Sequence, residues 1–256
     1  MRNSHFLLLL VGLMVSFIAH DASAQGSRNT GTTQRRGPAA VKSNEIGSTA
    51  VVIDETLSVL RLKPSLYADS LQRMRRGREV KILAVKAADG VNFYRISAPP
   101  NHVGWVQADA VFGRFRPSDE ARLANLVQAA EGFERLELAS AFLEVYPKSQ
   151  FSPAILLLFG DLAEEAAVKL SKDASIRLKR QEMAASAAPS HSYFLNFVGL
   201  DRYRKLGIRF LFNSATKTFH YSGESWAAIV KLHTDSLQAA EAQKRLLSLK
   251  QRMEVR

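Results

Sequence analysis

The sequence predicts an α+β protein with two folded parts: a small β-barrel, then an array of helical hairpins with one inserted β-hairpin. Three observations predict it. Short β-branched and aromatic segments, separated by turn residues, fill 48–113. Apolar residues recur at helical spacing through 116–256. Within that second part, 208–221 alternates apolar and polar residues around a turn. A chain of 256 residues, 46% hydrophobic, is sufficient for one or two cores.

The N-terminus has the pattern of a secretory signal peptide over 1–24. A positive charge at Arg2 precedes an apolar run from Phe6 to Ala19, and Ala22 and Ala24 have the spacing of a cleavage site. The run is shorter than the ~20 apolar residues of a spanning helix, which favours a cleaved peptide over a retained anchor. We therefore expect an exported envelope protein, periplasmic or secreted, with no transmembrane segment after cleavage.

The next segment, 25–47, predicts a disordered basic linker. It is rich in Gly, Ser, Thr, Asn and Arg and has almost no large apolar side chains. Such a segment cannot bury enough surface to offset the loss of chain entropy on folding. It would act as a flexible tether.

The barrel prediction rests on six short strand-like segments. Val80 and Ile82 alternate with Glu79 and Lys81, which indicates a strand with one buried face. Several short strands at this spacing are typical of a small barrel or sandwich. The segments are TAVVID, TLSVLR, SLQRM, EVKILAV, VNFYRIS and VGWVQ.

The helical part begins after Pro117. Ser118 is a good N-cap, Asp119 and Glu120 suit the positive end of a helix, and Pro153 suits a first helical position. Short helices with tight connections are typical of a helical-hairpin array. We expect helices near 119–131, 133–146, 153–170, 174–187, 192–206, 224–232 and 236–252.

The β part resembles the bacterial SH3 domain family. The matching stretches are LSVLRLKPS, MRRGREVKIL, FYRIS and GWVQADAV, in that order over 57–111. Two departures are Leu60, inserted between Val59 and Arg61, and the pair Phe93-Tyr94, where the family commonly has Trp-Tyr. The resemblance implies a barrel of five to six strands. Members of the family often target cell-wall peptides or act as envelope interaction modules.

The helical part looks like tetratricopeptide-type repeats. The best stretches are FLEVYPKSQFSPAILLL, 142–158, and WAAIVKLHTDSLQAAEAQKRL, 226–246. Each has a helix, a short turn and a second helix with Ala on its packing face, whereas 171–223 matches poorly. This resemblance implies a scaffold that binds a protein partner.

Two sets of residues are candidates for binding. The resemblance implies a peptide groove of Arg61, Tyr94 and Trp105, since aromatic rings line such grooves; a core position for Trp105 is the alternative. The basic run QRMRRGREVKIL supplies candidate anion contacts at Arg73, Arg75, Arg76 and Arg78. The alternative is a solvated turn in which Gly77 takes the unusual backbone angle, and we expect neutralisation of Arg75 and Arg76 to leave the fold stable.

Composition argues against several chemistries. Without cysteine there is no disulfide, thiolate nucleophile or Cys-based zinc site. The histidines lack metal-ligand spacing, and neither a nucleophile elbow nor a phosphate loop is present. We therefore expect no metal site, no cofactor and no catalytic residues. The formal charge of +11 points to an acidic partner, but the export signal and the lack of a nucleic-acid module argue against nucleic acid.

The sequence therefore predicts a non-enzymatic exported envelope protein. Its barrel would bind a cell-wall peptide, a peptidoglycan fragment or another anionic envelope component, and its helices a protein. One alternative is a pure protein–protein scaffold in which the barrel is structural. Another is a cell-wall hydrolase, or an accessory to one, because such barrels often accompany hydrolases.

Overall fold

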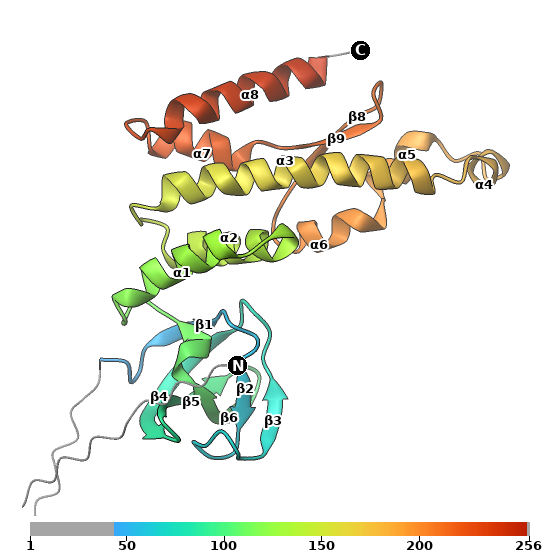
Figure 1. The fold of residues 1–256 in the computed structure, drawn as a ribbon. Helices are drawn as coiled ribbons and strands as arrows, with labels where there is room; N and C mark the ends of the chain where they lie inside the picture. The colour runs from blue at the N-terminus through green and yellow to red at the C-terminus, as the bar shows by residue number, and fades with distance from the viewer. Residues whose placement is uncertain (1–43, 255–256) are drawn as a thin grey trace, which may run out of the picture. The chain divides into compact units, whose positions relative to one another are not determined.

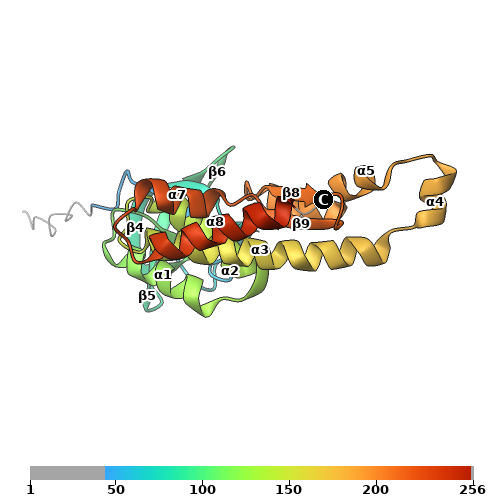
Figure 2. The same ribbon diagram turned by 90° about the horizontal axis from the view of Figure 1, so that it is seen from above.

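The computed structural model describes residues 44–254, which belong to one compact unit, 42–256 (Figures 1 and 2). The predicted signal peptide and all but the end of the predicted linker lie outside the described residues. Within the described part, the fold is mixed α+β, as predicted, with a curled antiparallel sheet followed by helices. None of the helices in this part is long and apolar enough to cross a membrane.

The sheet has seven strands in the order β3-β2-β6-β5-β4-β1-β7. One face encloses a core that includes Leu60, Val80, Ile82 and Val106. Each of the six predicted segments contains a strand, and the seventh strand, β7, follows a short 3-10 helix at Ala108–Ala110. The bounds are β1 Thr49–Val52, β2 Val59–Arg61, β3 Ser70–Arg73, β4 Glu79–Ala88, β5 Val91–Ala98, β6 His102–Gln107 and β7 Val111–Phe112.

The helices form successive layers, in which α3 lies between the pair α1–α2 and the pair α7–α8 (Figure 1). The long helix α3 contacts a helix of each pair and also the strand β9. The bounds are α1 Ser118–Ala129, α2 Gly132–Val145, α3 Ser152–Arg177, α4 Arg180–Ala185, α5 Ser190–Leu195, α6 Asp201–Arg204, α7 Glu224–Leu232 and α8 Gln238–Glu254.

The segment between α3 and α7 differs from the prediction in its helices. The predicted helix 174–187 does not start separately, because α3 continues to Arg177 through a stretch without Gly or Pro. The predicted helix 192–206 is broken into α5, a 3-10 turn at Val198–Leu200, and α6. Phe194, Phe197 and Leu200 are all buried. Packing of these side chains therefore prevails over a single regular helix.

The β-hairpin predicted within 208–221 is present. Strands β8, Phe210–Asn213, and β9, Thr218–Tyr221, pair antiparallel. Ser171 of α3 donates its hydroxyl to the carbonyl of Ala167 and accepts the backbone N–H of Phe219 at 2.7 Å. The hairpin is thereby attached to α3.

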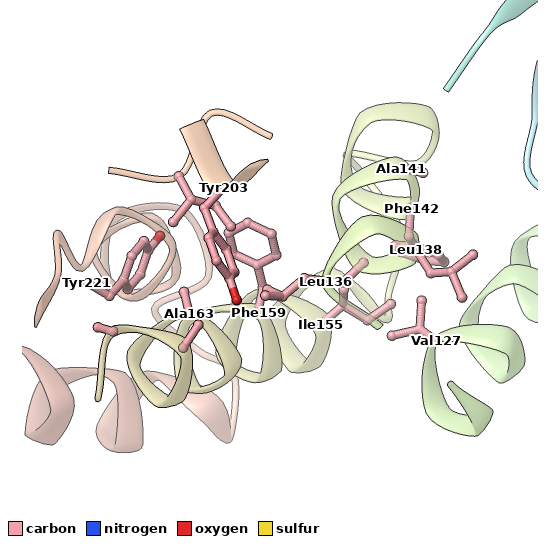
Figure 3. Close-up of a cluster of buried hydrophobic side chains, with 14 of the residues drawn as sticks. Val127, Leu136, Leu138, Ala141, Phe142, Ile155, Phe159, Ala163, Tyr203 and Tyr221 are labelled. Atoms are coloured by element: carbon pink, nitrogen blue, oxygen red, sulfur yellow. The ribbon is translucent and has the colours of Figure 1, made fainter. Parts of the chain in front are cut away.

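One hydrophobic core runs through the helices and reaches the sheet. Figure 3 shows side chains of α1, α2 and α3, including Val127, Leu138 and Phe142, packed together. The same cluster includes Ile53 and Phe112 from the β part.

A buried carboxylate at the start of α1 also joins the sheet to the helices. Asp119, which is 0% exposed, accepts hydrogen bonds from Arg116 at 2.6 Å, Arg122 at 2.8 Å and the Gly113 N–H at 3.1 Å. Since the core and this network are continuous across the join, the sheet and the helices form a single folded body.

Candidate functional site

The outer face of the sheet carries a row of three side chains on adjacent strands. Trp105 of β6 is the cross-strand partner of Arg61 on β2 and of Arg95 on β5. Directly paired residues point to the same face of a sheet. Their neighbours along the strands, Leu60 and Val106, belong to the core on the other face of the curled sheet, so the row faces outward.

The cations in this row have no acidic partner within the described part of the chain. Arg95 is exposed, and neither it nor Arg61 forms an ion pair with a residue of 44–254. Arg61 donates from Nη1 to the carbonyl of Ala68 at 2.7 Å, while its Nε is buried without a hydrogen-bond partner. Trp105 is half-buried between them. The row therefore presents an aromatic ring between two guanidinium groups that are free of carboxylates.

The loop from β2 to β3 is fixed beside this row. Asp89, in the turn from β4 to β5, accepts hydrogen bonds from the Ser65 hydroxyl at 2.6 Å and from the Leu66 N–H at 2.7 Å. These bonds, the Ser65 hydroxyl first, lower the pKa of Asp89. The same loop holds Tyr67, which is 89% exposed. Asp89 thus holds the loop at Ser65 and Leu66, and Arg61 holds it at Ala68. The ring of Tyr67, between these two points, is exposed to solvent.

Tyr94 lies on the opposite face of the sheet from Arg61 and Trp105. It is 1% exposed, its hydroxyl donates to Glu45 at 2.6 Å, and its ring meets Phe115 edge-on with centroids 6.2 Å apart. Burial raises its pKa far above that of a free tyrosine. The structure therefore brings together two residues of the predicted groove and places the third in the core.

Arg95 is the member of the row that the sequence reasoning missed. The signal was present in FYRIS, where alternation places Tyr94 and Ile96 on one face and Arg95 on the other. Because β5 has one buried face, Arg95 points to the outer face, beside its cross-strand partner Trp105 on β6.

The basic run around Gly77 is occupied largely by internal contacts. Arg76, whose side chain is 13% exposed, forms ion pairs with Glu134 at 2.7 Å and Glu137 at 3.0 Å on α2, and donates to the Ile53 carbonyl at 2.9 Å. Desolvation raises the pKa of Glu137, and the charge of Arg76 acts against that shift. Arg76 therefore joins the sheet to the helices and is not available to an external anion.

The other three arginines of the run differ among themselves. Arg73 donates to the carbonyls of Glu55 at 2.6 Å and Thr56 at 2.8 Å, and Arg78 donates to the carbonyl of Pro99. The side chain of Arg75 is exposed and contacts no polar partner among the described residues. Gly77 has a φ of 80°, as the turn interpretation requires. Of the four predicted anion contacts, Arg75 is the one whose side chain is fully free.

A pocket lies at the start of α1 and in the turn between α2 and α3. This pocket of about 600 Å³ is lined by Arg114, Arg116, Lys148, Glu120 and Tyr146, among others. Arg116 is bound to Asp119, and Arg114 donates to the carbonyl of Val145 at 2.7 Å. Burial raises the pKa of Tyr146 to about 12. Two of its cations, Arg114 and Arg116, are committed to internal partners, and Glu120 opposes the remaining Lys148, which makes this pocket a weaker candidate for an anion.

A buried polar network lies between α3, β9 and α8. Glu164 lies 2.9 Å from Nδ1 of His220, accepts the Tyr221 N–H at 2.7 Å and pairs with Arg252 at 2.6 Å. Nε2 of His220 lies 3.1 Å from the hydroxyl of Thr218 on the same strand. These groups satisfy one another's hydrogen-bonding capacity, and they bind the hairpin and α8 to α3. Across 44–254 no cluster of three or more His, Asp or Glu side chains is arranged to hold a metal ion.

Comparisons of the chain with protein-family models, with curated proteins and with solved structures gave no significant match.

Proposed function

We propose that this protein is a non-enzymatic, exported binding protein of the cell envelope. Its β part would be a barrel of the bacterial SH3 type that binds a peptide or cell-wall fragment, and its helical part would resemble tetratricopeptide repeats that bind a protein. The observation that carries the proposal is the row of Arg61, Trp105 and Arg95, an outward-facing aromatic ring between two cations that form no ion pair with an acid of residues 44–254.

Two further observations support a binding role for this face. The β2–β3 loop is pinned beside the row through Asp89 and Arg61, and a preformed site loses less entropy on binding than a mobile one. Exposed apolar side chains surround the row: Leu71 lies at the strand irregularity opposite Arg61, and Val103 is two residues from Trp105 on β6. Such a surface suits an extended peptide with alternating side chains.

Sedimentation with cell-wall sacculi tests the proposal. The chain from Gln25 to Arg256 should co-sediment at physiological salt, and exchange of Trp105 for Ala should reduce the bound fraction. A thermal unfolding curve of each variant separates lost binding from lost folding. Failure of the folded wild-type chain to sediment would reject the wall-binding proposal.

A second candidate function is a protein–protein scaffold in which the β part is structural. Exposed apolar side chains on the helices favour it, among them Val168 and Ile176 on α3 and Leu247 on α8. In that case a pull-down from an envelope extract would lose its partners on exchange of Ile176 and Leu247 for Asp and keep them on exchange of Trp105. The reverse pattern would favour the β face.

A further inference from the structure

The row on the sheet supports a more specific inference, which rests on the proposed peptide-binding function. We propose that Arg61 and Arg95 clamp a carboxylate of an acidic peptide above the ring of Trp105, with the neighbouring peptide side chains resting on the exposed apolar residues around it. The ligand class is thus a peptide with a free carboxylate, and the three residues form one site.

The strand register gives the site its dimensions. Cross-strand neighbours lie about 5 Å apart, and Arg61 and Arg95 are each one strand away from Trp105. The two arginines therefore flank Trp105 on the outer face of the sheet, and Arg61 has one of its two terminal nitrogens on the Ala68 carbonyl. A planar guanidinium matches a carboxylate with two parallel N–H donors.

Charge around the row favours an anion. Strands β2, β5 and β6 contain the two arginines and His102 but no Asp or Glu. On β4, Lys81 and Lys86 are exposed and pair with β5 residues of the same face, Ser97 and Phe93. The exposed acids that flank these strands, Asp69, Glu79 and Asp89, are fewer than the four cations, so an incoming carboxylate meets a net positive charge.

The apolar surroundings favour a peptide over a nucleic acid. One aromatic ring lies in the row, whereas strands of nucleic acid are held by several stacked bases on several rings. Leu71 and Val103, both 45% exposed, would contact aliphatic side chains on either side of the carboxylate. Tyr67 lies next to Ala68, whose carbonyl holds Arg61, and would close one end of the site.

The emission of tryptophan provides the assay, because the chain has two tryptophans and only one lies at the site. Trp226 is 0% exposed in the helical core, so a change on titration reports Trp105. The probes are a blocked pentapeptide, acetyl-Ala-Leu-Glu-Leu-Ala-amide, its Gln counterpart, and the Gln peptide with a free C-terminal carboxylate. The neutral Gln peptide should not bind. Binding of the Glu peptide would show that the site takes a side-chain carboxylate, and binding of the free-acid peptide would show that it takes the carboxylate at the end of the peptide.

Three matched variants test the clamp. Arg95→Gln should weaken binding about fivefold, because Arg95 is exposed. Arg61→Gln, at a half-buried position, should weaken it about tenfold. Arg75→Gln removes the same charge elsewhere on the β part and should change binding less than about twofold at 0.15 M salt. Since the Arg95 side chain forms no hydrogen bond or ion pair with residues 44–254, its variant keeps the test independent of folding.

Each contrary outcome separates the inference from the proposed function. Equal binding of the three peptides, or equal loss in the Arg75 and Arg95 variants, would overturn the clamp while sedimentation with sacculi still upheld envelope binding. Tighter binding of a single-stranded oligonucleotide or of phosphatidylglycerol vesicles than of any carboxylate peptide would also overturn it. Absence of both peptide binding and sedimentation would reject the inference and the function together.

Discussion

Arg76 is the arginine of the basic run whose removal should cost the most stability. Its guanidinium bridges the sheet to Glu134 and Glu137 on α2 and donates to the carbonyl of Ile53. The test variant is Arg76→Met, which keeps the apolar stem and removes the charge and the donors. The neighbouring Arg75→Met removes the same charge where the side chain has no polar partner within the described part of the chain.

The magnitude follows from the exposure of each partner. The two glutamates are partly exposed, so each ion pair is worth about 0.5 kcal/mol. The hydrogen bond from the charged group to the Ile53 carbonyl adds about 1.5 kcal/mol. Arg76→Met should therefore lower the free energy of unfolding by about 2.5 kcal/mol, against less than about 0.5 kcal/mol for Arg75→Met.

The same variant should change how stability depends on pH. The pKa of Glu137 is already raised in the folded protein by desolvation, and Arg76 opposes that rise. Without Arg76 the folded-state pKa rises further, so the folded state binds more protons than the unfolded state around that pKa. The destabilisation should thus be smallest below the unfolded pKa of Glu, about 4.3, and increase as pH rises through the folded pKa.

Urea unfolding of the chain from Gln25 to Arg256 at pH 4 and pH 7 measures these effects. Adding Glu137→Gln to Arg76→Met should restore about 1 kcal/mol at pH 7, because it removes a carboxylate left half-buried without its cation. Equal stabilities of the Arg75 and Arg76 variants at pH 7 would refute the reasoning. That result would uphold instead the expectation that the whole run is a solvated turn.

Three further substitutions test the packing of the helices. Gly160→Ala should lower stability by about 2 kcal/mol or more, because its Cβ would lie 2.3 Å from Nε1 of Trp226; a thermal midpoint equal to that of the wild type would contradict the packing of α3 on α7. Glu164→Gln should cost about 3 kcal/mol through the loss of its ion pair and buried hydrogen bonds, against less than about 0.5 kcal/mol for the exposed Glu165→Gln, both measured by urea unfolding. Tyr146, whose pKa is raised to about 12, should make stability fall as pH rises above about 10, where the unfolded phenol ionises first. The loss between pH 9 and pH 11 should be smaller in Tyr146→Phe, and an unchanged slope would argue against the buried phenol.

The parts of the fold that follow from local pattern were predictable. Alternation in EVKIL places Val80 and Ile82 in the core, and Ser118 and Pro153 mark helix starts within a residue or two of the observed ones. Hairpin β8–β9 was likewise indicated by its alternation and turn. These features depend on residues close together in the sequence, where propensity and period decide the structure.

The features that depend on distant contacts were not predictable from pattern alone. Phe194 and Phe197 break the expected helix 192–206 because both enter the core, where Phe194 stacks on Phe212 at 4.9 Å. Tyr94 lies in the core because it alternates with Arg95 along β5 and so points to the opposite face. Its aromatic character suggested a groove, but it does not indicate to which face of the strand the side chain points. Arg76 looked like its neighbours in the sequence, and only its approach to α2 distinguishes it.

The distribution of arginine partners links these observations to function. A run of basic residues in the sequence suggests an anion site, yet Arg73, Arg76 and Arg78 donate to the protein's own carbonyls and carboxylates. Arg61 and Arg95 are 34 positions apart in the numbering and attract no attention as a pair, but the register places one on each side of Trp105. An arginine that already neutralises an internal acid gains little from an external one. Arg95 has no polar side-chain partner among the described residues, and Arg61 donates from one nitrogen to the Ala68 carbonyl but pairs with no acid there. The binding surface of this protein is therefore better sought where its cations lack partners than where they are densest along the chain.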